Sequence, residues 1–485
     1  MLLSLFIGAL LAGCAVTPAP DGDAIRSDAL QGVALREDWV ENAPDGDVTG
    51  GWLATFDDPA LPPLVAEALA ANPDQRAAQA RIEKAAANLA VAQGYLRPAV
   101  GLFAGTSTKA GSDSGGLTGT ILSASWELDL WGRLRYGRNA RREELAATQA
   151  DYAFARQLLA ARVVQTWYTT TQIRLQRDLA RSLVEAAEQG VTLAEKRKKV
   201  GVGLERDVVL AQASANQYRD AAVQLDLAYD QSGRALELLL GRYPAAEIAT
   251  PEDLPSPPAD VPAGQPMQML ERRPDLFAAE RRVAAAFDRV GEAKAARLPS
   301  IALTASGSWL ESDVLEFKSD YDNPGVGLAA RLVAPIYQGG SLKAQVDVRT
   351  AEQREALASY ATAALAAIGD VENALNATRL LEQRRIVLEL ASQQNARALA
   401  LEQKAYEVGR NDMRDVIRQR VALFGSQTAL LAVRGDQLVQ RVNLYLALGG
   451  SFEAAQAPAD DRGAEGGEAV AAASEPVAIN EGNDR

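Results

Sequence analysis

Residues 72–98 read NPDQRAAQARIEKAAANLAVAQGYLRP, and residues 273–299 read RPDLFAAERRVAAAFDRVGEAKAARLP. Pro73 and Pro98 each have a counterpart 201 residues later, at Pro274 and Pro299. Further along the chain, VGVGLERDVV matches VGRNDMRDVI, which begins at Val408. A colinear series of matches indicates that the chain is an internal duplication.

Each copy predicts very long helices. The segments 133–199 and 341–407 contain no proline and are 67 residues each, so a helix over either would be about 100 Å long at ~1.5 Å per residue. Half-length helices are predicted at 61–96, 205–240, 267–298 and 413–448. Two half-length helices stacked end to end match one long helix, so each copy predicts a long helix paired with two short ones.

Short segments between these helices alternate apolar and polar residues, which predicts strands with one apolar face. They are 121–130, 301–309, 326–334 and, less clearly, 100–107. Each is near the roughly 9–11 residues of a membrane-spanning strand. Four strands cannot close a barrel with a lumen, and lipid does not tolerate open sheet edges. The sheet is therefore either soluble and half-buried or part of a barrel shared by several chains. Trp126 and Trp309 lie on the apolar faces, as interfacial aromatics or as interior packing residues.

The predicted organisation has six parts. These are a signal peptide at 1–13, a mature N-terminal segment at 14–60, a first repeat at 61–243 with a β-hairpin at about 99–130, a Pro-rich linker at 244–266, a second repeat at 267–450 with a β-hairpin at about 300–336, and an acidic disordered tail at 451–485. The predicted fold class is mainly α, with the strands expected to contribute to a membrane β-barrel.

The apolar run 2–12 is too short to span a bilayer as a helix and suits a signal-peptide core. It ends in Leu11-Ala12-Gly13-Cys14, which resembles a bacterial lipobox and predicts a covalent lipid on Cys14. The next residue is Ala15. In similar lipoproteins an aspartate at this position favours the inner membrane, so its absence here favours the outer membrane. The alternative is an ordinary secretory signal with an incidental cysteine.

The composition excludes several function classes. The chain has no histidine, one cysteine and a net charge of -13, which excludes triads that use histidine, His-rich or Cys-rich metal sites and a nucleic-acid footprint. We therefore expect no enzyme activity, no metal and no cofactor beyond the lipid on Cys14.

The duplicated plan resembles the TolC family of outer-membrane channel proteins, and within it the OprM/NodT lipoprotein branch that serves resistance-nodulation-division (RND) efflux pumps. The residues that carry the resemblance are Cys14, WLATFDDPAL at 52–61, Asn72-Pro73-Asp74, WELDLWGR at 126–133, RRPD at 272–275, Leu298-Pro299 and PIYQGG at 335–340. The resemblance implies a homotrimer whose four strands per chain form a twelve-stranded barrel in outer-membrane lipid. It also implies a periplasmic α-barrel below, a periplasmic adaptor (membrane fusion) protein and an inner-membrane RND pump.

The resemblance also implies a site at the far end of the long helices. The turns expected to meet the adaptor are Gly201, Val202, Gly203, Leu204, Gly409, Arg410 and Asn411. The expected periplasmic gate residues are Asp207, Tyr406, Arg414 and Asp415. Asn411 occupies the position of the family's gate arginine. Arg410 and Arg414 are the two nearby arginines that could take the role of that arginine. Asp207 and Asp415 could equally be carboxylates that stabilise a helix N-terminus.

The sequence is also compatible with two other functions. One is a TolC-like export duct for type I protein secretion, and the other is a coiled-coil envelope lipoprotein without a pore. The strand alternation argues against the second.

Overall fold

Two helices of 67 residues run along the molecule, α5 (Arg133–Lys199) and α9 (Ser341–Glu407). Both begin after a glycine in the left-handed region, Gly132 at φ 78° and Gly340 at φ 84°. Their bounds coincide with the predicted segments. Glycine at both ends explains this agreement, because a positive φ is strained for other residues and stops a helix.

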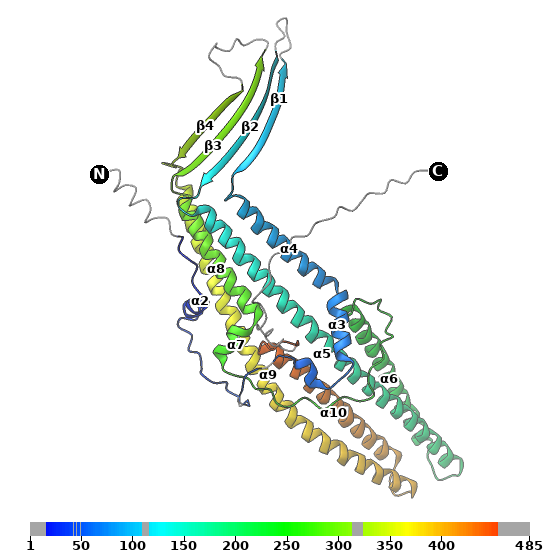
Figure 1. Cartoon of the computed structure of the whole chain (residues 1–485). Helices are drawn as coiled ribbons and strands as arrows, with labels where there is room; N and C mark the ends of the chain where they lie inside the picture. Colours follow the sequence, from blue (N-terminus) through cyan, green and yellow to red (C-terminus); the bar gives the residue numbers. More distant parts are fainter. Residues whose placement is uncertain are drawn as a thin grey trace, which may run out of the picture.

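The computed structural model describes residues 16–41, 43–44, 46–48, 50–108, 116–312 and 324–453. The chain forms a rod with a four-stranded sheet at one end and the tips of paired helices at the other (Figure 1). Cys14, the predicted signal peptide and most of the predicted acidic tail lie outside the described residues.

Shorter helices pack along the long ones, as predicted. Along α5 lie α4 (Pro73–Gly94) in the upper half and α6 (Glu205–Leu239) in the lower half. In the second copy, α8 (Pro274–Ala295) and α10 (Met413–Ala447) lie between α5 and α9 and contact both. The two copies therefore stand side by side in one row (Figure 1).

The prediction of uninterrupted helices over 61–96 and 267–298 is wrong. The first is divided into α3 (Leu61–Ala71) and α4, and the second into α7 (Pro266–Arg272) and α8. The residue before each internal proline is extended, since proline disfavours the helical conformation there. At the first break, Asn72 Oδ1 accepts a hydrogen bond of 2.8 Å from the amide of Asp74.

The sheet has the antiparallel order β1 (Ala99–Thr108), β2 (Gly116–Leu128), β3 (Ser300–Ser312) and β4 (Gly325–Val333). Its register aligns the apolar faces of all four strands. One row across the sheet is Val100, Ala124, Ala305 and Leu328, and the adjacent row, on the opposite face, is Gly101, Ser123, Ser306 and Gly327. Among the described residues, β1 and β4 pair on one side only, so the sheet is open at both edges.

The predicted strand 121–130 begins earlier and ends earlier, at Gly116 and Leu128. Asp129 ends the strand because its carboxylate accepts hydrogen bonds of 3.0 Å from the amides of Leu134 and Arg135. The side chain therefore satisfies amides at the start of α5, where a negative charge is favourable.

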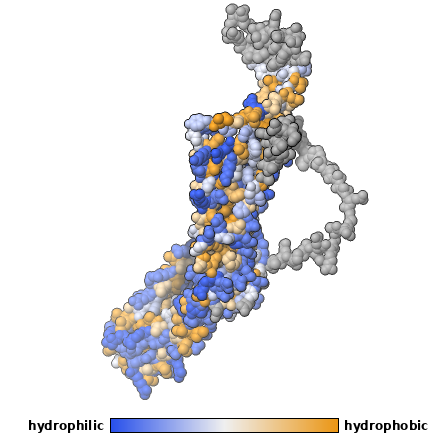
Figure 2. All heavy atoms as spheres, turned by 90° about the vertical axis from the view of Figure 1, so that its left-hand side faces the viewer, coloured by the Kyte–Doolittle hydropathy of each residue, from blue (hydrophilic) through white to orange (hydrophobic). Residues whose placement is uncertain are grey.

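The main core lies halfway along the rod, where the N-terminal segment, the linker and the C-terminal end of α10 meet. The N-terminal segment contains α2 (Gly22–Ala29) and the 3₁₀ helix η1 (Trp52–Phe56). Trp52 stacks on Tyr445 with ring centroids 5.9 Å apart, and the linker places Leu254 in the same core. Hydrophobic residues gather on the sheet, whereas hydrophilic residues cover much of the helical part (Figure 2).

Candidate functional site

The predicted turn residues form two tight connections at the helical end of the rod, farthest from the sheet (Figure 1). Gly201 and Gly409 have φ of 81° and 74°. In the first turn the amide of Val202 donates to the carbonyl of Arg197 at 3.0 Å, and in the second the amide of Arg410 donates to that of Ala405 at 2.8 Å. These bonds close each long helix in the manner of a Schellman motif.

Aliphatic side chains are exposed on both turns. They are Val200, Val202, Leu204 and Val408. Gly203 cannot be enlarged, since a Cβ there would lie 2.8 Å from the backbone nitrogen of Lys198. A group of exposed aliphatic residues on a fixed backbone is typical of a docking surface.

Tyr406 lies in the last turn of α9 with its ring buried, at 3% exposure. The guanidinium carbon of Arg197 lies 4.4 Å from the ring centroid, and Arg197 Nη1 donates to the Tyr406 carbonyl at 2.8 Å. Sequence reasoning missed Arg197, because it lies in the other copy and only the packing of α5 against the second repeat brings it to Tyr406.

Asp207 lies beside this pair and is 8% exposed. Its Oδ1 and the Tyr406 hydroxyl are buried, and neither has a hydrogen-bond partner among the described residues. Burial raises the pKa of Tyr406; Arg197 opposes this shift, whereas the charges of Asp207 and Asp412 increase it. The predicted gate residues Asp207 and Tyr406 therefore do share one buried site.

Arg414 and Asp415 make local contacts instead. Arg414 pairs with Asp412 at 2.7 Å, and Asp415 pairs with Arg418 at 3.1 Å. Asp412 caps α10, and its pKa is lowered chiefly by the hydrogen bond from Arg414. Asp207 and Asp415 both lie in the first turn of a helix. Their positions therefore also fit the alternative hypothesis that these carboxylates stabilise helix N-termini. The assignment of all four residues to a gate stays a prediction.

Other contacts also join the two copies in the lower half. Arg206 of α6 lies 3.3 Å from the carboxylate of Asp412, the residue that caps the start of α10. Arg420 of α10 donates to the carbonyl of Ala186 in α5 at 2.8 Å. Relative movement of the two hairpins would have to break these bonds together with the Arg197–Tyr406 contact.

At the other end of the rod, both tryptophans lie on the apolar face of the sheet. Trp126 pairs with Leu303, and its indole donates to the carbonyl of Leu96 at 3.0 Å, next to the start of β1. Trp309 is exposed. A ring with an apolar body and a bonded indole N–H suits the edge of a bilayer.

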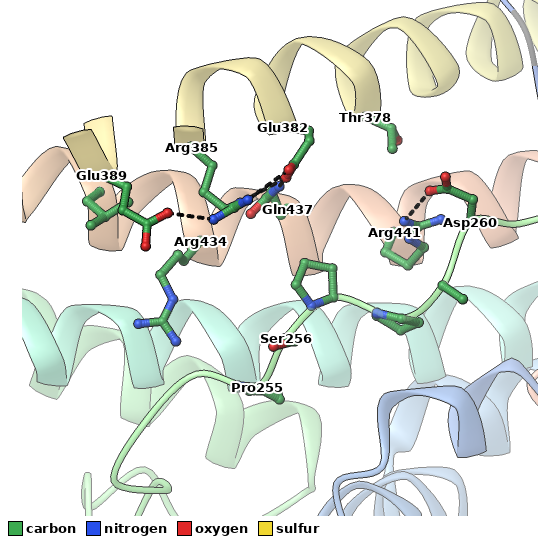
Figure 3. Close-up of a pocket in the computed structure, with 14 residues that line it drawn as sticks. Pro255, Ser256, Asp260, Thr378, Glu382, Arg385, Glu389, Arg434, Gln437 and Arg441 are labelled. Carbon is green, nitrogen blue, oxygen red and sulfur yellow. Dashed lines mark hydrogen bonds and ion pairs between the residues drawn. The ribbon is translucent and has the colours of Figure 1, made fainter. Parts of the chain in front are cut away.

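A groove of about 670 Å³ lies between the linker and the helices α9 and α10 (Figure 3). Its arginines already have carboxylate partners. Arg385 lies between Glu382 and Glu389, Arg441 pairs with Asp260, and Arg434 pairs with Asp253. The pairs of Arg434 and Arg441 therefore hold the linker against α10.

In the described part of the chain, no group of three or more His, Cys, Asp or Glu residues could hold a metal ion. None of the described helices combines the length and the apolar composition needed to cross a bilayer.

A sheet with one apolar face, carried on a bundle of paired long helices, defines the class of outer-membrane channel proteins. The family model for outer membrane efflux protein matches residues 64–242 and again 266–450. The pyoverdine export outer membrane protein OpmQ of Pseudomonas aeruginosa is 30% identical over 471 residues, which cover 93% of this chain and 97% of OpmQ.

The cation efflux system protein CusC of Escherichia coli is 28% identical over 470 residues, 93% of this chain and 99% of CusC. Among solved structures, the outer-membrane channel OprN aligns with a TM-score of 0.78 at 25% identity, covering 90% of this chain and 98% of OprN. The chain therefore belongs to the outer membrane efflux protein family, the TolC-like channels, and is an outer-membrane efflux channel with a large helical portion.

Proposed function

We propose that three copies of this chain share one twelve-stranded barrel and act as a passive conduit in a tripartite efflux pump. The observation that carries the proposal is the open sheet, with an apolar face that continues across all four strands and two edges with which no described strand pairs. An open edge in lipid leaves backbone groups without partners, so the edge strands β1 and β4 must pair with other chains. The helices below would then continue the pore as a periplasmic tunnel.

The helical end would contact a periplasmic adaptor, which joins the channel to an energy-supplying RND pump in the inner membrane. The exposed aliphatic residues of the two turns support this contact. In the same proposal, Arg197, Tyr406 and Asp207 hold the tunnel closed at rest, and a lipid on Cys14 anchors the chain to the outer membrane.

Two alternatives predict different partners. A type I secretion duct would use the same fold with another pump. Efflux is favoured because similar proteins are described as outer membrane proteins of antibiotic and toluene efflux pumps. A pore-free coiled-coil lipoprotein does not account for the aligned apolar face of the sheet.

Site-specific photocrosslinking in living cells tests the proposed complex. A crosslinking side chain at Val202 should capture a periplasmic adaptor of an RND system, whereas one at Val40, exposed on the N-terminal segment, should not. Capture of a type I secretion adaptor would favour the alternative. Equal capture from both positions, or none, would contradict the docking surface.

A further inference from the structure

Arginines converge on one place just below the sheet, although the chain has a net charge of -13. Two adjoining cavities, of about 540 and 300 Å³, share the side chains of Arg141, Arg289 and Arg349. The remaining arginines that line them are Arg282 in the larger cavity and Arg133 and Arg138 in the smaller. They come from α5, α8 and α9, the upper helices of both copies.

The arginines lie on the concave side of the row of helices. Ala92 and Tyr95, at the end of α4, line the smaller cavity together with residues of the other three upper helices. One cavity that contacts all four helices of the row shows that the row is hollowed on this side, so this side is the concave one. Arg133 also binds Glu127 at 2.8 Å, and Glu127 alternates with Trp126, so it lies on the polar face of β2.

The N-terminal segment marks the opposite side of the row. Its Arg26 binds Glu280 of α8 at 3.1 Å. On a helix of ~3.6 residues per turn, Arg289 is nine positions from Glu280 and so lies on the other face of α8. The arginine cluster therefore faces away from the N-terminal segment, toward the same side as the polar face of the sheet.

Carboxylates balance this cluster only in part. Arg141 and Arg289 share Glu144, Arg349 pairs with Glu352 at 2.7 Å, and Arg282 pairs with Asp151. Among the described residues, Arg138 bonds only the side chain of its neighbour Asn139 and makes no ion pair. The pKa of Arg289 is lowered by burial and by repulsion from Arg141 and Arg349, whereas Glu352 and Glu292, which also line the cavities, oppose the shift.

Part of this network is structural, since the Arg289–Glu144 and Arg282–Asp151 pairs tie α8 to α5. Structural pairing does not use every donor, because the planar guanidinium has five N–H groups and Arg141 and Arg349 remain about half exposed. Forked donors of this kind bind carboxylate and phosphate oxygens.

We propose that this arginine cluster is a binding site for the anionic group, carboxylate or phosphate, of a solute that passes through the channel. The proposal rests on the proposed conduit, in which the concave side of the helices faces the tunnel. Three copies of the cluster would then form a ring of positively charged side chains between the tunnel and the barrel, and anions would concentrate there.

Binding is measured on the full-length protein in detergent at low ionic strength, where charge screening is weak. The probes are inorganic phosphate and citrate, followed by calorimetry. We expect saturable binding by the unchanged protein and at least about tenfold weaker binding by Arg141→Gln/Arg289→Gln/Arg349→Gln, since one lost charge-assisted bond has about that effect. The control, Arg181→Gln/Arg219→Gln/Arg234→Gln, removes three arginines of similar exposure from the lower helices and should stay within about twofold.

The tighter of the two probes identifies the class of anionic group. Equal binding by all three proteins, or no saturable binding of either probe by the unchanged protein, would overturn the proposal. The single variant Arg349→Gln controls for misfolding of the triple variant, because Arg349 pairs within its own helix and its ion pair does not join two helices. It should weaken binding in the same direction.

Planar bilayers supply a second readout. Under a KCl gradient, the reversal potential of the unchanged channel should indicate more chloride permeation than that of the triple variant, whereas the control should match the unchanged channel. A protein that binds phosphate but forms no pore would contradict the proposed conduit and leave the anion site standing. A pore whose reversal potential is identical in all three proteins would contradict the site.

Discussion

Arg197 lies over the ring of Tyr406, with its guanidinium carbon 4.4 Å from the ring centroid, and donates a 2.8 Å hydrogen bond to the Tyr406 carbonyl. Arg197 is near the end of α5 and Tyr406 near the end of α9. One side chain therefore fastens the first helical hairpin to the second at the end of the molecule where we propose the gate.

Removing this contact should open the channel. A cation over a buried ring contributes about 2 kcal/mol, which corresponds to a roughly 30-fold change in a closed-to-open ratio. We expect Arg197→Ala to raise single-channel conductance in planar bilayers and to admit vancomycin to cells. Tyr406→Phe combined with Asp207→Ala keeps the ring and the carbonyl but removes the buried hydroxyl and carboxylate beside Arg197, and it should act in the same direction. Lys199→Ala, two residues away and exposed, is the control. If these variants conduct like the parent, the gate hypothesis is contradicted, and Asp207 only stabilises the N-terminus of its helix.

The same experiment ranks the two candidate arginines. Arg414 pairs with Asp412 in its own turn, so Arg414→Ala should raise conductance less than Arg197→Ala. The reverse order would restore Arg414 as the gate arginine and contradict the importance of the contact with Tyr406.

The two faces of the sheet should respond differently to charge. Leu328 is 85% exposed on the apolar face, and Ser306 lies one register position away on the polar face. Leu328→Arg should destabilise the inserted barrel by about 2–4 kcal/mol if the site is near the bilayer midplane, whereas Ser306→Arg should be milder. The measurement is the yield of heat-modifiable oligomer in outer membranes. Equal yields from the two variants would exclude a lipid-facing role for Leu328.

Asp288 predicts a pH dependence of stability. This carboxyl of α8 is 2% exposed. Burial raises its pKa from 3.8 to about 7, Glu143 acts in the same direction, and Arg142 and Arg138 oppose the shift. The folded protein therefore holds a proton that the unfolded chain releases at lower pH. This stabilising contribution is complete below about pH 4 and is lost as the pH rises toward 7.

Asp288→Asn should therefore unfold at a higher temperature than the parent at pH 8 and at a similar temperature at pH 4. The upper limit of the difference is about 4 kcal/mol per chain. The control is Asp220→Asn, at an exposed position on α6. A difference in melting temperature that does not change with pH would contradict the assignment of this proton to Asp288.

Lipidation at Cys14 follows from the sequence alone, since Cys14 lies outside the described residues. Metabolic labelling with a radioactive fatty acid should mark the protein, and Cys14→Ser should remove the label. The variant can still insert, because the barrel would span the membrane without a lipid. Label that persists in Cys14→Ser would refute the lipobox reading.

The sequence predicted the long helices closely because local signals define both of their ends. Gly132 and Gly340 precede them and Gly201 and Gly409 follow, all with positive φ. The breaks at Pro73 and Pro274 were also marked in the sequence, but the prediction treated these prolines as repeat markers and overlooked their effect on the preceding residue.

The contacts between copies could not be predicted in the same way. Arg197 and Tyr406 are 209 residues apart, and no local pattern specifies which arginine reaches the ring. The arginine cluster could not be predicted from local sequence either, because its residues come from three helices, α5, α8 and α9. Side chains from distant segments meet only when the helices have packed.

The mass of the detergent-solubilised protein tests the central claim most directly. The sheet is open at β1 and β4, so the account predicts that native mass spectrometry finds three chains per particle, from which folded monomer cannot be separated without loss of the sheet. A stable, folded single chain in detergent, with its strands intact, would contradict the shared barrel.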